Sequence, residues 1–405
     1  MPPSDRLFWV ASEQEIKSGQ TTDVYFRYAA ETLSKEGINP RVTMEVYARS
    51  LPFPGNWGVL CGVNEVAALL EGLPVDVLAM EEGEVFLTNP GSVVYEPVMR
   101  VEGRYLDFCV YENPVLGFLC SESGIASKSA RIRLAARGKT VFSFGSRRVH
   151  PAIAPAVERA AYIGGMDRVS NVLGAKLLNQ KAVGTMPHAM IQCIGDQVEA
   201  WKAFDKHMPR DVPRIALIDT FSDEKSEAMA AYAALGRKLY GVRIDTPSSR
   251  RGNWRKIIEE VRWELNARSG RDVKIFLSGG LDEESIALHS DLADGFGVGT
   301  CVSAAPVVDF SMKIVQLEEK GRIVMRAKRG DIGGRKQVFR NSKTFHDIVT
   351  LEGRRAPKGY RALLTPLLKN GRLARELKDE DYVHTRVKAN LRKLMRLQPR
   401  LEWVV

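Results

Sequence analysis

"RIALIDTF" at residues 214–221 is an unbroken aliphatic run that ends in polar residues, and "LYGVRIDT" at residues 239–246 repeats this pattern. A continuous aliphatic run is typical of a parallel strand that is buried on both faces. The segment between them, "SDEKSEAMAAYAAL" (222–235), carries acids in its first turn, and Ser222 is its predicted N-cap. These residues therefore predict a strand, a helix and a second strand in succession.

The same pattern continues to residue 300. The helix predicted after residue 246 is amphipathic and ends at Gly270. Its apolar face consists of Trp254, Ile257, Ile258, Val261 and Leu265. Two further aliphatic runs, "FLSGG" (276–280) and "DGFGVGT" (294–300), each precede a short helical stretch. Successive strand–helix units of this kind predict an irregular (β/α) barrel whose functional site lies at the carboxyl ends of the strands.

The chain before residue 120 has a different organisation. A short helix is expected around 64–72, and strands are expected around 84–89 and 96–108, the second of them broken at a glycine turn. The predicted fold class is α/β, an irregular (β/α) barrel with an α+β N-terminal sandwich domain that C-terminal segments complete. The predicted domains are 1–120, 121–310 and 311–405, and the last of these returns to the N-terminal domain.

The C-terminal segment contains one more predicted helix, at 385–397. Its apolar side consists of Val387, Leu391, Leu394 and Met395, and basic residues occupy the other side. This pattern favours packing onto the N-terminal domain over binding to nucleic acid.

Composition narrows the class of partner. The 405 residues include 59 Lys and Arg against 49 Asp and Glu, which gives a formal net charge of +10 and a pI near 9.3. Such an excess favours anionic partners, either phosphorylated metabolites or nucleic acid. The five cysteines form no CxxC pair, and we find neither a signal peptide nor a membrane-spanning apolar run. We therefore expect a cytoplasmic protein that does not bind membranes.

Glycines follow two of the predicted strands at corresponding places. Ser278, Gly279 and Gly280 end one strand, and Gly299 and Thr300 end the next. Glycine lets backbone N–H groups approach a ligand closely, and a helix that starts just afterwards adds positive partial charge. The two ends together predict a site for one phosphate group, although tight turns alone would also use these glycines.

Two aspartates occupy matching positions at the other two strand ends. Asp219 and Asp245 would point into the mouth of a barrel, where a carboxylate can bind sugar hydroxyls or magnesium. Either aspartate could instead cap the helix that follows it. Together with the predicted phosphate site, they suggest a ribose phosphate as ligand.

Basic residues cluster in predicted loops. Arg147 and Arg148 follow a strand, Arg250 and Arg251 follow Asp245, and residues 328–336 form a basic, glycine-rich segment. Pyrophosphate or a carboxylate would match these groups, although loop arginines are often only solvated.

His188 follows a turn at residues 185–187. A histidine there could accept a phosphoryl group, act as a general acid or base, or pack in the core. On the residues alone, the core interpretation is favoured.

These motifs resemble the nicotinate phosphoribosyltransferase family, especially its archaeal-type members, in their order and approximate spacing over roughly residues 15–340. The motifs are "FGSRRVHP", "GGMDRVSNVLGA", "GTMPHA", "LIDTFSDEKSEA", "GVRIDTPSSRRGN", "FLSGGLDEESI" and "DGFGVGT". The resemblance implies an enzyme of NAD salvage that makes nicotinate mononucleotide and pyrophosphate from nicotinate and phosphoribosyl pyrophosphate. It also implies Mg²⁺ as cofactor, ATP as co-substrate and a homodimer or larger homo-oligomer.

The same resemblance assigns roles to individual residues. Phosphoribosyl pyrophosphate would bind at Arg148, Arg243, Arg250, Ser278, Gly279, Gly280, Gly299 and Thr300. Nicotinate would lie between the rings of Tyr25 and Phe144, beside Gly145, Arg147 and Thr185. The catalytic residues would be His188, Asp219 and Asp245, with both aspartates as magnesium ligands and His188 as the residue that ATP phosphorylates.

Two departures from the family pattern affect these expectations. Ala189 follows His188 where many members carry a hydroxyl residue, so recognition of the carboxylate would depend on backbone N–H groups and arginine. No cysteine follows Cys301, so we expect no structural zinc. Three alternatives to a nicotinate enzyme stay open at this point: a quinolinate phosphoribosyltransferase, a nicotinamide phosphoribosyltransferase and a basic barrel that binds nucleic acid without catalysis.

Overall fold

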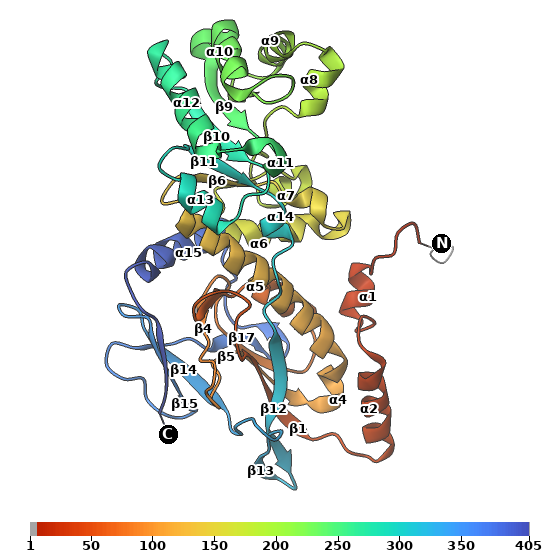
Figure 1. Cartoon of the computed structure of the whole chain (residues 1–405). Helices are drawn as coiled ribbons and strands as arrows, with labels where there is room; N and C mark the ends of the chain where they lie inside the picture. The colour runs from red at the N-terminus through yellow and green to blue at the C-terminus, as the bar shows by residue number, and fades with distance from the viewer. Residues whose placement is uncertain (1–5, 405) are drawn as a thin grey trace. The chain divides into compact units, whose positions relative to one another are not determined.

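The computed structural model describes residues 6–404, which form two compact units (Figure 1). Unit 1 consists of Met1–Ser127 and Pro306–Val405, and unit 2 of Lys128–Ala305. The chain passes from unit 1 to unit 2 within helix α5 (Glu112–Ala135) and returns before Pro306. The division into three domains stays a prediction, because compactness alone does not show which segments fold by themselves.

Unit 2 is built on a six-stranded sheet whose neighbouring strands are all parallel. The order across the sheet is β7 (Arg168–Val169), β6 (Thr140–Ser143), β11 (Gly295–Val298), β10 (Lys274–Ser278), β9 (Leu239–Ile244) and β8 (Arg214–Leu217). The helices of this unit are α6 (Ala154–Ile163), α7 (Val172–Leu177), α8 (His188–Ile194), α9 (Gln197–His207), α10 (Glu224–Leu235), α11 (Ser248–Arg251), α12 (Trp254–Ala267), α13 (Glu283–His289) and α14 (Thr300–Ser303).

The arrangement of unit 2 confirms the predicted alternation of strands and helices. Strand β8 is followed by α10, β9 by α11 and α12, β10 by α13, and β11 by α14 (Figure 1). Over the described residues the sheet has two edges, β7 and β8, so the irregular barrel is an open, curled sheet. Strands β8, β10 and β11 are buried almost throughout, as their aliphatic runs predicted, whereas Tyr240 of β9 is 49% exposed.

Two local predictions in unit 2 differ in outcome. Helix α12 buries Trp254, Ile258, Val261 and Leu265, as its periodicity predicted, whereas Ile257 is only half-buried. The predicted N-cap of α10 was wrong by one residue, because Asp223 and not Ser222 accepts the N–H of Ser226. The backbone N–H of Ser222 instead donates to Glu227 Oε1 at 2.7 Å.

Unit 1 combines strands from both ends of the chain. Its main sheet has the order β13 (Arg322–Met325), β12 (Phe310–Glu319), β1 (Arg41–Ala48), β5 (Pro97–Arg104), β3 (Asp76–Ala79), β17 (Thr365–Lys369) and β18 (Arg372–Leu373). A second sheet has the order β16 (Arg361–Ala362), β14 (Lys336–Asn341), β15 (His346–Leu351) and β19 (Arg400–Trp403), and β2 (Trp57–Val59) pairs with β4 (Val85–Leu87). The C-terminal segments therefore complete the N-terminal sheet, as predicted.

Two predictions for unit 1, a turn at Gly103 and the burial of Met395, were wrong. The helices of this unit are α1 (Glu13–Lys17), α2 (Val24–Lys35), α3 (Val63–Leu70), α4 (Tyr105–Phe108), the start of α5, and α15 (Glu380–Leu394). Gly103 makes no turn, since β5 runs through it and a Cβ there would lie 2.8 Å from Val75 Cγ1. Val387, Leu391 and Leu394 are buried in α15, but Met395 is 62% exposed because the helix has ended before it. Of the helices in residues 6–404, none has both the length and the apolar character needed to span a membrane.

Candidate active site

The carboxyl ends of the parallel strands in unit 2 gather the predicted site residues at one edge of the sheet. Asp219 follows β8, Asp245 follows β9, Ser278 ends β10, Gly299 follows β11, and Phe144 follows β6. Strands β10 and β11 pair directly, with Ser278 opposite Gly297, so their glycine loops are neighbours. The sheet order alone therefore brings residues more than 150 positions apart to one place.

Hydrogen bonds join three of these strand ends in series. Asp219 Oδ2 accepts the backbone N–H of Asp245 at 2.7 Å, and Asp245 Oδ1 accepts the hydroxyl of Ser278 at 2.7 Å. Neither aspartate caps the helix that follows it, because Asp223 is the N-cap of α10 and Pro247 is the N-cap of α11. The capping interpretation of the two aspartates was therefore wrong.

The two carboxylates lie in different environments. Asp219 is 4% exposed, and burial raises its pKa. Burial also opposes ionisation of Asp245, which is 29% exposed, but the side chains of His188 and Ser278 outweigh it and lower its pKa. Asp219 Oδ1 is buried and has no hydrogen-bond partner among the described residues. A buried carboxylate oxygen of this kind, next to a second carboxylate, fits a divalent cation such as Mg²⁺.

His188 lies between these two carboxylates. It is the first residue of α8, and its Nδ1 is 3.0 Å from the hydroxyl of Thr220. Its Nε2 is 3.6 Å from Asp245 Oδ2 and 3.8 Å from Asp219 Oδ1. The neighbouring Asp245 carboxylate, aided by Asp219, raises the pKa of His188 against the opposing effect of burial. With 37% of its side chain exposed, His188 is not a core residue, so the favoured interpretation from the residues alone was wrong.

Arg243 supplies a half-buried positive charge beside the aspartates. Its Nη2 donates to the carbonyl of Met186 at 3.3 Å, whereas its Nε is buried without a partner among the described residues. Burial lowers its pKa, and the charge of Arg147 adds to this effect while Asp245 and Asp219 oppose it. The hydroxyl of Thr185 is likewise buried and unpartnered within residues 6–404. These groups leave hydrogen-bonding capacity for a polar ligand.

The glycine loops have the backbone freedom that the prediction required. Gly279 and Gly280 have φ of +88° and +66°, and a Cβ on Gly279 would lie 2.9 Å from the carbonyl oxygen of Asp245. No protein acceptor in the described part of the chain receives the backbone N–H of Gly280 or Gly299, whereas Gly279 continues the ladder between β10 and β11. Free N–H groups at two adjacent strand ends are the donors that a phosphate group needs.

Phe144 and its neighbours lie where β6 meets β11. The Phe144 ring covers Gly297 so closely that a Cβ there would come within 2.3 Å of its Cε2. A Cβ on Gly145 would lie 2.7 Å from Ser303 Cβ, so glycine permits the contact with α14. Arg148 Nε donates to the Thr300 hydroxyl at 3.4 Å and so joins the loop after β6 to the loop after β11.

Two predicted residues are not part of this group. Tyr25 lies in unit 1, on α2, where it is 56% exposed and its ring centroid is 4.3 Å from that of Phe26. Arg250 is exposed on α11, and its backbone N–H donates to the carbonyl of Pro247. Neither is among the groups that the sheet edge of unit 2 brings together.

Several supporting residues escaped sequence analysis. Buried Glu227 of α10 accepts the N–H groups of Thr220 and Phe221 and so fixes the loop that follows Asp219. The Thr246 hydroxyl oxygen lies 3.1 Å from Asp219 Oδ2 and 2.5 Å from Glu224 Oε1, so its single proton is shared between the two carboxylates. An acid in the first turns of a helix normally indicates an interaction with the helix dipole. The one signal in the sequence was the repeated Asp-Thr pair at the ends of both strands, which marks Thr220 and Thr246 as neighbours of the two aspartates.

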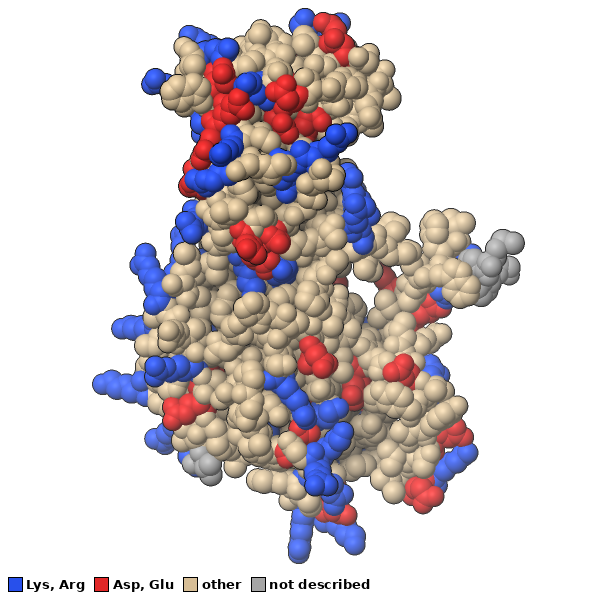
Figure 2. Space-filling model, viewed as in Figure 1, with Lys and Arg blue, Asp and Glu red and all other residues tan. Residues whose placement is uncertain are grey.

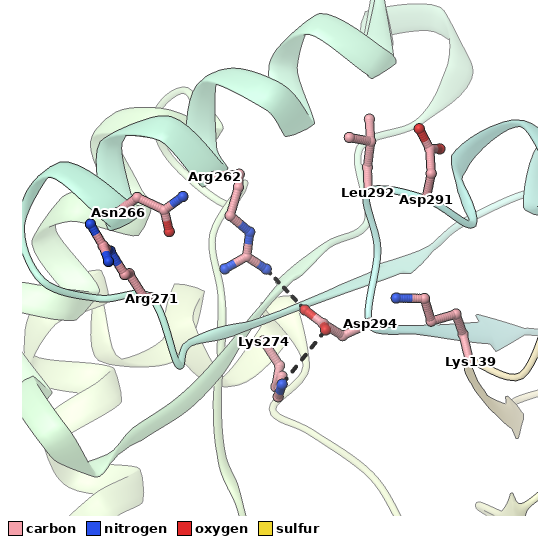
Figure 3. Close-up of a pocket in the computed structure, with 8 residues that line it drawn as sticks. All are labelled: Lys139, Arg262, Asn266, Arg271, Lys274, Asp291, Leu292 and Asp294. Atoms are coloured by element: carbon pink, nitrogen blue, oxygen red, sulfur yellow. Dashed lines mark hydrogen bonds and ion pairs between the residues drawn. The ribbon is translucent and has the colours of Figure 1, made fainter.

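A cavity of about 390 Å³ lies at the other end of the same strands (Figure 3). Lys274 begins β10, whereas Ser278 ends it. Asp294 accepts from Arg262 at 2.9 Å and lies 3.7 Å from Lys274 Nζ, so two of the cations around this cavity already share a carboxylate. We therefore do not place the candidate active site in this cavity.

Unit 1 contains a group of metal-ligand type. Cys61 Sγ and carboxylate oxygens of Glu82 and Glu122 lie within 4.8 Å of one another, and all three residues are buried. The Glu82 carboxylate accepts the N–H groups of Gly62 and Asn64, and the Cys61 thiol donates to Glu122. The Glu82 carboxylate and the Cys61 thiol thus already have hydrogen-bond partners, and we assign no metal to these three residues.

Comparisons identify relatives of nearly the whole chain. Residues 23–123 match the family model of the quinolinate phosphoribosyl transferase N-terminal domain, and residues 125–313 match that of its C-terminal domain. A nicotinate phosphoribosyltransferase of Mycobacterium tuberculosis is 29% identical over 394 residues, which cover 88% of this chain and 82% of that protein. The sequence similarity thus extends well beyond the motifs of the site.

Solved structures of similar proteins also cover nearly the whole chain. A Pyrococcus furiosus protein described as nicotinate-nucleotide pyrophosphorylase is 50% identical, with a TM-score of 0.92 over 96% of this chain and 99% of that one. Human nicotinic acid phosphoribosyltransferase shares the fold, with a TM-score of 0.76 and 18% identity over 95% of this chain and 97% of that one. The architecture of both units is therefore that of solved relatives.

Proposed function

The chain belongs to the nicotinate phosphoribosyltransferase family, with the type II phosphoribosyltransferase fold, and on this basis we propose that it joins nicotinate to phosphoribosyl pyrophosphate. The products are nicotinate mononucleotide and pyrophosphate, in a step of NAD salvage. The observation that carries this proposal is the series Asp219–Asp245–Ser278, which ties three strand ends together beside free glycine N–H groups. Such an arrangement suits a ribose ring with a phosphate at one end.

The glycine loops are the proposed binding site of the 5′-phosphate. Gly280 and Gly299 offer backbone N–H groups and Thr300 adds a hydroxyl, while Ser278, whose hydroxyl donates to Asp245, and Gly279 complete the same two loops. The phosphate negative charge would be stabilised by these donors and by the arginines that follow β6 and β9. Arg148 follows β6, Arg250 follows β9, and Arg243 lies within β9; we assign all three to phosphoribosyl pyrophosphate.

The pyridine ring has a proposed place against Phe144. The ring of Phe144 lies over Gly297, next to Gly145, and Arg147 follows in the same 3-10 turn. Arg147 and the free hydroxyl of Thr185 are the proposed partners of the nicotinate carboxylate.

The reaction requires displacement of pyrophosphate from C1 of the ribose through an oxocarbenium-like state. The site must therefore hold the leaving group by charge and the pyridine nitrogen in line behind C1. The Asp219 and Asp245 carboxylates would bind ribose hydroxyls and stabilise positive charge on the sugar. An aromatic wall at Phe144 would exclude water from the cation.

Asp219 and Asp245 are also the proposed ligands of Mg²⁺. The unpartnered oxygen of Asp219 supports this assignment, because a hard cation would satisfy it. When bound, the ion would neutralise charge on the pyrophosphate.

His188 is the proposed acceptor of a phosphoryl group from ATP, which couples ATP hydrolysis to product formation. Its exposure and its freedom from the core support this role, as does the hydrogen bond of Nδ1 with Thr220, which orients the ring. The transfer of the ribosyl group does not require this histidine as a nucleophile.

An assay of pyrophosphate release tests the proposal. Nicotinate, nicotinamide and quinolinate are supplied in parallel with phosphoribosyl pyrophosphate and Mg²⁺, each with and without ATP. We expect release with nicotinate, and stimulation by ATP. Release with quinolinate or nicotinamide but not with nicotinate would replace the proposal by one of those alternatives, and samples without a pyridine substrate control for simple hydrolysis.

Non-catalytic binding to nucleic acid is not favoured by the surface. On the face shown in Figure 2, Lys and Arg side chains are interspersed with Asp and Glu and do not form one continuous patch. A groove for nucleic acid normally concentrates positive charge along one path. Nicotinate and phosphoribosyl pyrophosphate therefore remain the proposed partners.

The proposed assembly is a homodimer or larger homo-oligomer in the cytoplasm. Exposed apolar residues support a contact between copies, namely Val24, Tyr25 and Tyr28 on α2 and Val172, Leu173 and Leu177 on α7. Light scattering coupled to size exclusion would measure the mass directly, and a monomer at micromolar concentration would contradict this part of the proposal. Five free thiols support a reducing compartment.

A further inference from the structure

Arg251 joins two loops at the candidate active site. It is the last residue of α11, in the segment after β9, and its Nε donates to the carbonyl of Thr246 at 3.0 Å. Its Nη2 donates to the carbonyl of Gly279 at 2.5 Å, in the loop after β10. The centre of the guanidinium also lies 3.7 Å from the centroid of the Trp254 ring, which is buried. Three contacts therefore fix one cation between two strand ends.

The contact with Gly279 determines the direction of the next N–H group. The carbonyl of Gly279 and the N–H of Gly280 belong to one peptide unit, and the two groups of a trans peptide point in opposite directions. The described residues contain no cis peptide bond. Because the carbonyl points at Arg251, the N–H of Gly280 points away from it, and no described protein group accepts that N–H.

Arg251 also strengthens this N–H group as a donor. A hydrogen bond from a charged guanidinium to a carbonyl polarises the peptide unit and increases the positive partial charge on its hydrogen. The loop needs such support, because two successive glycines with positive φ give it little rigidity of their own. Without Arg251, the peptide between Gly279 and Gly280 would be free to rotate.

We propose that Arg251 is a positioning residue for the sugar-phosphate site, which holds the Gly279–Gly280 peptide so that its N–H is presented to the phosphate. This inference rests on the proposed function, in which the glycine loops bind the 5′-phosphate. It separates Arg251 from its neighbour Arg250, which is exposed and does not hold the loop. Arg251 acts through Gly280 and does not itself bind the leaving pyrophosphate.

The test compares Arg251→Met with a matched control, Arg262→Met. Arg262 is also a half-buried arginine of unit 2, and its Nη1 donates to the carbonyl of Val273 at 2.8 Å, just before β10. Both variants remove a contact between a guanidinium and a backbone carbonyl, at opposite ends of one strand, and Arg262→Met also removes the ion pair with Asp294 at 2.9 Å. Calorimetric titration with ribose 5-phosphate and, separately, with pyrophosphate measures the two halves of the site.

We expect Arg251→Met to weaken binding of ribose 5-phosphate by about 10-fold, the factor that corresponds to about 1.4 kcal/mol. Binding of pyrophosphate should change by less than about twofold, and Arg262→Met should change neither. In steady-state assays, the KM for phosphoribosyl pyrophosphate should rise while the KM for nicotinate stays the same. A purely structural role would lower the melting temperature of both variants without this split.

Three results would overturn the inference. They are unchanged binding of ribose 5-phosphate in Arg251→Met, a selective loss of pyrophosphate binding in that variant, or equal effects in Arg251→Met and Arg262→Met. If Arg251→Met does not fold, Arg251→Lys retains the charge and the contact with Trp254 but lacks the guanidinium fork, and should give the same selective loss in smaller measure. Wild-type binding of ribose 5-phosphate without turnover of nicotinate would refute the transferase proposal alone, because these titrations do not depend on catalysis.

Discussion

His188 has a dual character at the residue scale. Its Nδ1 is held by Thr220, while its Nε2 faces the carboxylates of Asp219 and Asp245. These carboxylates favour the charged imidazolium and raise the pKa of His188 above its usual value of about 6.5. Only the neutral ring can attack a phosphoryl group, so the same neighbours that hold the ring also restrain its reactivity.

The labelling of His188 by ATP should therefore depend on pH. Because the raised pKa keeps the ring charged at higher pH, phosphorylation should increase as pH rises, with a midpoint above about 6.5. Incorporation of labelled phosphate from the γ position of ATP, followed between about pH 5.5 and 8.5, measures this midpoint. His188→Ala should lose the label and the stimulation by ATP but keep pyridine ribosylation. A midpoint below 6.5, or full labelling of His188→Ala, would contradict the assignment.

Substitutions of Asp245 and Asp223 should have opposite effects, one on turnover and the other on stability. Asp245 faces the site between His188 and Ser278, so Asp245→Ala should lower kcat by about 100-fold or more with little loss of stability. Asp223 only caps α10, so Asp223→Ala should cost about 1 kcal/mol of stability and leave kcat nearly unchanged. Steady-state kinetics and urea denaturation of both variants give the comparison. A folded Asp245→Ala enzyme with wild-type turnover would remove Asp245 from the site.

At the scale of elements, the loop between β10 and α13 depends on its glycines. Gly279 combines φ of +88° with a position where a Cβ would lie 2.9 Å from the Asp245 carbonyl oxygen. Gly72, in unit 1, has φ of +91° but no atom within 4 Å of its Cβ position. The two glycines therefore have nearly the same φ, but only at Gly279 would an added Cβ meet another atom.

Gly279→Ala should accordingly do more than Gly72→Ala. Both should lose about 1 kcal/mol from the left-handed conformation of alanine. Only Gly279→Ala should also displace the loop from Asp245 and raise the Kd of ribose 5-phosphate by about 10-fold. Denaturation curves and calorimetric titrations provide the two measurements. Equal affinity in both variants would show that the β10 loop does not bind the phosphate.

At the scale of the whole molecule, unit 1 is closed by the two ends of the chain. Strand β1 pairs with β12, and β3 pairs with β17. A buried ion pair joins these ends as well, since Lys336 Nζ lies 2.8 Å from Glu45 Oε2. Burial raises the pKa of Glu45, although Lys336 opposes this effect. Neither end of the chain can form this sheet alone.

Lys336→Met should destabilise unit 1 by about 3 kcal/mol, because it leaves the Glu45 carboxylate buried without its partner. Lys225→Met removes a lysine from an exposed pair with Glu260 and should have no measurable effect. Urea denaturation of both variants would test this contrast. A loss in Lys336→Met no larger than that in Lys225→Met would mean that the buried pair does not stabilise the sheet.

The features of the fold that could be predicted were those that depend on residues close together in the sequence. Continuous aliphatic runs at 214–221 and 239–246, and the helix periodicity after them, identified the strand–helix units of the sheet because such patterns reflect local burial. The cap of α10 was missed because Glu227 binds the preceding loop. That contact is visible only after the helix and loop have packed together.

The positions of Asp219, Asp245, Ser278 and Gly299 at strand ends could be read from the residues alone, since each directly follows or ends an aliphatic run. The adjacency of these ends, the 4% exposure of the Asp219 side chain and the place of His188 between two carboxylates follow from the packing of the chain. Strand order and burial depend on long-range pairing, which side-chain patterns along the chain do not specify. The same pairing sets the pKa values of His188 and both aspartates, because a carboxylate acquires its charge partners only where separate strands meet.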